Sequence, residues 1–189
     1  MKLLDKKILA VTDGSDGMIS QARGLANHIS EKVEDYKTEI YFPWSKAQPG
    51  FLPIYKWIFK QKINFIDKPD IIISCGRKSV YLSLFLKKIY KNKIFTIHIQ
   101  NPKINSKHFD CVVAPNHDGL YGTNVINSIG ALHQFTKDKI NNYNENFKTI
   151  EKENLVSVII GGKNRHYKFS LEIAKNIIEK IKKLKKKFN

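Results

Sequence analysis

The sequence predicts an α/β fold in which helices cover both faces of a parallel sheet. Short apolar runs alternate with segments of roughly ten to fifteen residues whose apolar positions recur at helical spacing. One run, Ile71-Ile72-Ile73, is continuous, as in parallel strands that are buried on both faces. The length of 189 residues suffices for one domain with a sizeable core and the beginning of another.

The elements follow one another in a regular order. Strands are expected at residues 6–12, 37–42, 71–74, 93–99, 109–114, 125–135 and 155–160, and helices at residues 20–30, 54–65, 77–90, 136–147 and 169–188. Trp57 should lie on the inner face of its helix. Such alternation gives a Rossmann-like sheet whose binding loops lie at the carboxyl ends of the strands.

A second domain is expected to begin late in the chain. The polar stretch 141–154 is the candidate linker, and one strand and one helix after it cannot bury their own apolar faces. We therefore predict a Rossmann-like domain at residues 1–148 and the incomplete start of a C-terminal domain at residues 149–189.

Composition and charge indicate where the protein is located and which partners it can have. The chain is 42% hydrophobic but has no apolar run that spans a bilayer, and its charged start lacks a signal sequence, so cytoplasmic residence is expected. The formal charge of +16 suggests a polyanion partner, but only three of the 33 basic residues are arginine. We attribute the charge to a coding bias toward Lys, Asn and Ile and expect no nucleic-acid partner. Generic polyanion binding remains the weakest alternative.

Four ordered motifs carry a family resemblance. They are the segment Thr12 to Gly17 with Gln21 and residues 24–26, then Cys75 to Lys78, then Gln100-Asn101-Pro102 through Phe109-Asp110, and finally Ala114 to Asp118 with residues 122–124 and 130–133. Together with Ile160-Gly161-Gly162 they resemble the mitochondrial fission (elongated-mitochondria) family, in a bacterial-type form. The resemblance implies two facing Rossmann-like domains of the glycosyltransferase-B type. Members are usually much longer, so we expect this chain to be truncated shortly after its second domain begins.

The first loop is a candidate acceptor site. Asp13, Gly14, Asp16 and Gly17 lie between a strand and a helix N-terminus, which favours an anion or a polar substrate, and Gln21 follows one turn later. The spacing is not that of the dinucleotide fingerprint. The alternative is a tight turn in which Ser15 or Asp16 caps the helix.

Further candidates follow the later strands. Arg77 is expected to bind substrate, or else to be a solvated surface residue. His117 and Asp118 are the expected catalytic pair with Asp13, because an imidazole can take a proton from a sugar hydroxyl. His117 can otherwise be a loop-structuring residue. Asn101 and Asn124 are expected to bind sugar hydroxyls, or to form turns.

The C-terminal motifs suggest phosphate and a membrane. Gly161, Gly162 and Lys163 resemble a phosphate cradle for a nucleotide-sugar. Seven lysines against one glutamate in residues 175–187 surround an apolar stripe, which could contact an anionic membrane or pack on its own sheet. No histidine or cysteine spacing suits a metal, so we predict neither a metal nor a resident cofactor.

Two functions follow from the resemblance. The first is the acceptor-side domain of a nucleotide-sugar-dependent glycosyltransferase, inactive alone, with a lipid-linked or small-molecule acceptor. The second is a non-catalytic adaptor that recruits a dynamin-type or other partner at a membrane.

Overall fold

A computed structural model of the chain describes residues 5–63, 68–91, 93–146, 158–160 and 168–188. Contacts divide the chain into two units, Met1–Thr136 and Lys137–Asn189. The predicted domain boundary at residues 148 and 149 falls outside the described residues and remains a prediction.

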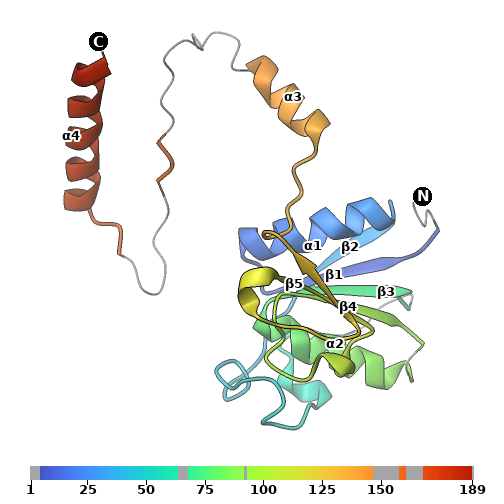
Figure 1. The fold of residues 1–189 in the computed structure, drawn as a ribbon. Coiled ribbons are helices and arrows are strands. Elements are labelled where there is room, and N and C mark those ends of the chain that lie inside the picture. The colour runs from blue at the N-terminus through green and yellow to red at the C-terminus, as the bar shows by residue number, and fades with distance from the viewer. Residues whose placement is uncertain (1–4, 64–67, 92, 147–157, 161–167, 189) are drawn as a thin grey trace. The chain divides into compact units, whose positions relative to one another are not determined.

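The first unit is built on one parallel sheet, which confirms the predicted fold class (Figure 1). In the described part of the chain the sheet has the order β2-β1-β3-β4-β5-β6, and every neighbouring pair is parallel. The strands are β1 (Ile8–Thr12), β2 (Val33–Lys37), β3 (Ile71–Cys75), β4 (Phe95–Ile99), β5 (Cys111–Pro115) and β6 (Val125–Ser128).

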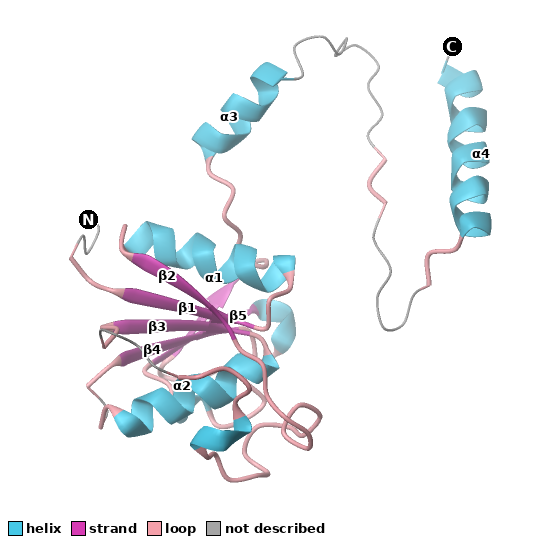
Figure 2. Ribbon diagram, turned by 180° about the vertical axis from the view of Figure 1, so that it is seen from behind, coloured by secondary structure: helices cyan, strands magenta, loops and turns pink. Residues whose placement is uncertain are grey.

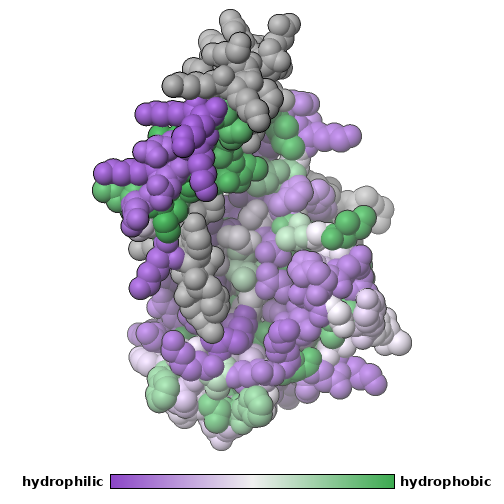
Figure 3. Space-filling model, turned by 60° about the vertical axis from the view of Figure 1, so that its left-hand side comes forward, coloured by the Kyte–Doolittle hydropathy of each residue, from purple (hydrophilic) through white to green (hydrophobic). Residues whose placement is uncertain are grey.

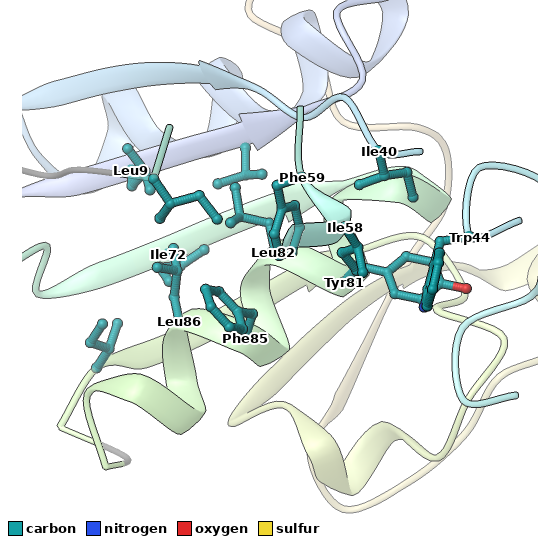
Figure 4. Close-up of a cluster of buried hydrophobic side chains, with 13 residues drawn as sticks. Leu9, Ile40, Trp44, Ile58, Phe59, Ile72, Tyr81, Leu82, Phe85 and Leu86 are labelled. Carbon is teal, nitrogen blue, oxygen red and sulfur yellow. The ribbon is translucent and has the colours of Figure 1, made fainter. Parts of the chain in front are cut away.

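One long helix covers each face of the sheet, α1 (Asp16–Ile29) on one side and α2 (Arg77–Ile89) on the other (Figure 2). Successive side chains of a strand point to opposite faces, so Ile8 and Ala10 pack under α1 whereas Leu9 packs with the α2 cluster. Figure 4 shows that second cluster, in which Tyr81 and Leu82 of α2 meet the sheet. Each fully buried aliphatic side chain contributes about 1.5–3 kcal/mol to folding.

The second strand lies earlier than residues 37–42, where the sequence predicted it. β2 is Val33–Lys37, and in the strand Glu34, Asp35 and Lys37 are exposed. An edge strand pairs through its backbone on one side only, so it needs few apolar residues and has no apolar run to reveal it. The apolar residues 40–42 instead begin a long loop, held by an isolated bridge between Ile40 and Phe59.

The predicted helix at residues 54–65 is also wrong for the residues that the structure describes. The only helical turn in residues 54–63 is the 3-10 turn Lys56–Ile58, and Trp57 is 60% exposed rather than facing inward. Tyr55 and Phe59, on either side of the turn, have extended backbones. Pro53 and the aromatic and β-branched residues after it have low helix propensity, which explains the difference.

The second unit contains two described helices, α3 (Lys137–Asn146) and α4 (Leu171–Phe188), as the sequence predicted within one or two residues. β6 ends at Ser128, so the strand predicted for residues 125–135 is shorter. Of the strand predicted at residues 155–160, positions 158–160 have no strand structure and the rest lie outside the described residues. No helix in the described part has the length and apolarity that crossing a membrane requires.

Candidate functional site

A polar pocket of about 300 Å³ lies where β4 and β5 end. Four of its lining residues were predicted as site residues, namely Gln21, Asn101, His117 and Asp118. Four others were not predicted: Gln100, Lys103, Pro115 and Ala131. The pocket therefore joins the start of α1 to the loops after two neighbouring strands, which the sequence separates by many residues.

The His117–Asp118 pair lies on a 3-10 turn, Asn116–Asp118, directly after β5. His117 Nε2 is 3.8 Å from Asp118 Oδ1, while Asp118 Oδ2 accepts a hydrogen bond of 3.0 Å from the backbone N–H of Asn101. The carboxylate is thus fixed between the imidazole and the β4 loop. The His117 side chain is 74% exposed, so it remains accessible to a ligand that enters the pocket.

Gln21 contributes a buried amide from α1. Its Nε2 donates to the carbonyl oxygen of Gly17, 3.3 Å away. Its Oε1 is buried and has no hydrogen-bond partner among the residues that the structure describes. A buried acceptor without a donor costs about 1–3 kcal/mol.

The β4 loop enters the pocket with a strained backbone. Gln100, the first residue after β4, has φ of +81°, and Lys103 has φ of +58°. The Asn101 side chain closes the turn, because its Oδ1 accepts from the backbone N–H of Lys103 at 2.9 Å. Positive φ at residues other than glycine is uncommon and concentrates at ligand-binding loops. The sequence could have identified Gln100 as a site residue by its position directly after a buried strand.

The segment 130–134 brings Ala131 to the pocket by packing across α1. The backbone N–H of Gln134 donates to Ser20 Oγ at 3.3 Å. A Cβ on Gly24 would lie 2.6 Å from the carbonyl carbon of His133, closer than real Cβ atoms approach. Glycine at position 24 therefore permits this close contact, and two separate sequence motifs meet here.

The predicted first-loop residues Asp13, Gly14, Asp16 and Gly17 lie outside the pocket lining. Asp13 Oδ1 accepts from both the N–H and the hydroxyl of Ser15, at 3.1 and 2.9 Å, which closes a turn before α1. Ser15 occupies the N-cap position without a side-chain capping bond, and Asp16 is the first helical residue. Gly14 has φ of +89°, which explains glycine there.

Met18 fills the space between the first loop and the strand ends. Its sulfur lies 3.2 Å from Cys75 Sγ and 3.5 Å from Gln100 Nε2. β1 and β3 are neighbours at the point where the strand order reverses, the usual ligand crevice in such sheets. A thioether occupies that crevice here, and the open pocket lies beside β4 and β5 instead.

Arg77 and Asn124 hold loops together and do not line the pocket. The Arg77 guanidinium donates to the carbonyl oxygens of Ser45 and Ala47 in the loop after β2. The Asn124 amide donates to the carbonyl oxygens of Ser106 and Phe109, at 2.8 and 3.0 Å. Gly161, Gly162 and Lys163 lie outside the described residues, so the phosphate cradle remains a prediction.

The strongly shifted titratable groups lie in the core, not in the pocket lining. Burial lowers the pKa of His98 to about 3, and its Nδ1 is 2.9 Å from Ser74 Oγ. Burial raises the pKa of Cys75 to about 12, so this thiol is no nucleophile at neutral pH. Both cysteines are free.

Asp110 forms a separate polar cluster before β5. Its Oδ1 accepts from Lys87 Nζ at 2.9 Å, and its Oδ2 accepts from the backbone N–H of Thr96 at 2.8 Å. Burial raises the pKa of Asp110, but the hydrogen bonds from Lys87 and Thr96 outweigh burial, and the net shift is downward.

The chain is similar in sequence to proteins of a bacterium and a plant. The chain is 27% identical to an uncharacterized protein of Rickettsia prowazekii (strain Madrid E), over 88% of this chain and 57% of that protein. It is 23% identical to the mitochondrial fission protein ELM1 of Arabidopsis thaliana, over 61% of this chain and 33% of that protein. The chain thus spans little more than half of one relative and a third of the other.

No solved structure matches the chain. The family model described as mitochondrial fission ELM1 matches residues 16–189, a range that includes every pocket residue. With a match over most of its length, the chain belongs to the mitochondrial fission ELM1 family.

Proposed function

We propose that this chain is the acceptor-side part of a glycosyltransferase-B-like protein and that the pocket binds a hydroxyl-rich acceptor. Amides, an imidazole and a carboxylate line it, and sugar hydroxyls both donate to and accept from such groups. The observation that carries the proposal is that the pocket brings together Gln21, His117 and Asp118, from α1 and from the loop after β5.

The proposed chemistry is proton removal from the acceptor. His117 takes the proton of an acceptor hydroxyl as that oxygen bonds to the anomeric carbon of the donor sugar, and the bond from that carbon to the diphosphate breaks. Asp118, held by the backbone N–H of Asn101, stabilises the resulting imidazolium. Asp13 has no role in this step, because its carboxylate closes the turn at Ser15. The nucleotide-sugar would meet this chain at the predicted phosphate cradle Gly161, Gly162 and Lys163, which lies outside the described residues.

Ligand-observed NMR with the full chain tests this assignment. Saturation transfer is measured to glucose, N-acetylglucosamine and uridine diphosphate, one at a time. The test variants are Gln21→Met, which removes the amide with little change in shape, and His117→Ala. His108→Ala is the matched control, since His108 is another exposed histidine but lines a different pocket.

The expected result is saturation of a sugar by the wild type and by the control, and a loss of about tenfold in affinity in either test variant. Sugar binding that survives both test variants would place the ligand elsewhere. Binding of uridine diphosphate without any sugar would reverse the acceptor assignment, and absence of all binding would overturn the proposal.

A membrane adaptor is the second candidate, and α4 supports it. Ile173, Ile177 and Ile181 are spaced one turn apart and half-buried, whereas the neighbouring Lys180 and Lys182 are exposed. Such a helix suits an anionic lipid surface, at which the chain would recruit a protein partner. Charge reversal by Lys180→Glu with Lys182→Glu should then release the chain from vesicles that contain phosphatidylglycerol. Unchanged binding would contradict this role for α4.

A further inference from the structure

The loop between β2 and β3 exposes an unusual number of aromatic rings. Phe42 is 79% exposed and Phe51 is 76% exposed, although both side chains lack any polar atom. The exposed rings of this aromatic segment, residues 41–57, are those of Tyr41, Phe42, Phe51, Tyr55 and Trp57. Clustered exposed apolar side chains mark interaction surfaces more often than scattered ones do.

The aromatic segment is anchored, so its rings are displayed on a fixed base. Trp44 and Ile58 are buried in the cluster beneath α2, as Figure 4 shows. Trp44 donates from Nε1 to the carbonyl oxygen of Pro53 at 2.9 Å and meets the Trp57 ring edge-on at 4.8 Å. Trp57 in turn stacks on Tyr55, with 5.8 Å between centroids and 8° between planes. Folding therefore buries one tryptophan and presents the other to solvent.

Every charged side chain within residues 40–63 is a lysine. Lys46, Lys56, Lys60 and Lys62 are exposed, and no acidic residue occurs between Glu39 and Asp67. In Figure 3, green and near-white side chains lie together at the lower end of the molecule, the end at which this cyan segment lies in Figure 1, with purple side chains around them. The segment therefore combines exposed aromatic rings with exposed lysines.

We propose that the aromatic segment is a membrane-contact site that inserts its rings into the interface of an anionic bilayer. Tryptophan and tyrosine favour the headgroup region, and phenylalanine partitions deeper. Each lysine near an anionic surface adds about 1 kcal/mol of attraction. A protein interface of ordinary composition is depleted in lysine, so the combination of lysine with aromatic rings and no acid fits lipid better.

This contact would place the polar pocket near the bilayer. Gln48 Nε2 donates to the carbonyl oxygen of Lys103 at 2.7 Å, and Lys103 lines the pocket. Lipid-linked acceptors would then reach the pocket from the membrane. That consequence rests on the proposed acceptor function, whereas the membrane contact itself does not.

Vesicle co-sedimentation of the full chain tests the contact, with vesicles of phosphatidylcholine alone and of phosphatidylcholine mixed with phosphatidylglycerol. The test variant combines Phe42→Ser and Phe51→Ser, which changes only exposed rings. Tyr121→Ser is the matched control, because Tyr121 is 74% exposed and lies outside the segment. We expect binding to the mixed vesicles, weakened about tenfold or more in the test variant and unchanged in the control.

Tryptophan emission supplies an independent readout. Trp57 is exposed and Trp44 is buried, so wild-type emission should shift to the blue on mixed vesicles. Trp57→Phe should abolish the shift while binding persists.

Three results would overturn the proposal. They are no binding of the wild type to mixed vesicles, binding that survives Phe42→Ser with Phe51→Ser, and self-association that depends on these rings in the absence of lipid binding. Loss of vesicle binding leaves sugar saturation at the pocket measurable, so failure of either proposal is distinguishable from failure of the other.

Discussion

Replacing Gly24 by alanine tests how the pocket segment 130–134 is held on α1. In a helix interior this substitution ordinarily stabilises by about 1 kcal/mol, because glycine has the larger backbone entropy to lose. Here the added Cβ would lie 2.6 Å from the carbonyl carbon of His133 and 3.0 Å from the nitrogen of Gln134. Both neighbours are backbone atoms, so relief requires a shift of the whole segment.

The expected magnitude follows from these opposing effects. Overpacking of this kind costs about 1–3 kcal/mol, so Gly24→Ala should range from nearly neutral to about 2 kcal/mol less stable than the wild type. Gly17→Ala is the matched control. It is the same substitution in the same helix, and its Cβ would meet nothing within 4 Å. The difference in unfolding free energy between the two variants should therefore be about 1–3 kcal/mol, with Gly24→Ala the less stable.

Urea unfolding followed by circular dichroism measures this difference, provided that both variants keep the wild-type slope. Hydrogen exchange at the Gln134 amide, which donates to Ser20 Oγ, reports whether the segment has moved. If Gly24→Ala proves as stable as Gly17→Ala and the Gln134 amide keeps its protection, the packing of residues 130–134 across α1 is wrong.

Three further substitutions address the titratable groups whose pKa values are shifted. Burial lowers the pKa of His98 from 6.5 to about 3, so unfolding takes up a proton below pH 6.5. The unfolding free energy of the wild type should therefore fall by about 1.4 kcal/mol per pH unit between pH 6.5 and pH 3. His98→Gln should lack this component when urea midpoints are compared across that range, and equal slopes would contradict it. The hydrogen bonds that Asp110 accepts lower its pKa below 3.8, so its contribution is present above that pH and lost as the pH falls through the folded value. Asp110→Asn should cost about 1 kcal/mol at neutral pH, since the partly exposed carboxylate is screened by solvent, and this gap should close in acid. A gap that persists in acid would refute the linkage. The Cys111→Ala variant leaves Cys75 as its one thiol, and burial raises the pKa of that thiol to about 12. Cys75 should therefore react with a disulfide reagent only after unfolding. Rapid labelling of the native chain would count against its burial.

The central sheet was predictable because its strands carry their own signal. β1, β3 and β5 are nearly or wholly buried, and most of their residues are apolar. β2 carries no such signal, since Val33–Lys37 is an edge strand whose place depends on backbone pairing with β1. The segment at residues 54–63 failed for the opposite reason. Its apolar residues suggested a helix. Ile58 and Phe59 are indeed buried, but the backbone on either side of the short 3-10 turn is extended.

The candidate site divides in the same way. His117, Asp118 and Asn101 could be named from sequence because each follows a recognisable strand, and parallel strands bring their carboxyl ends to one edge. Arg77 was expected at a ligand, yet its guanidinium meets the backbone carbonyls of Ser45 and Ala47, a contact between distant segments.

Local pattern was thus enough to predict the α/β class, the buried strands and the edge at which a site would form, because periodicity and burial are encoded within short segments. Which polar groups share the pocket was decided by packing between segments far apart in the chain. Met18 fills the crevice between β1 and β3, and Gly24 admits the segment that carries Ala131 to the pocket. Such contacts depend on shape and distance in three dimensions, which no local pattern records.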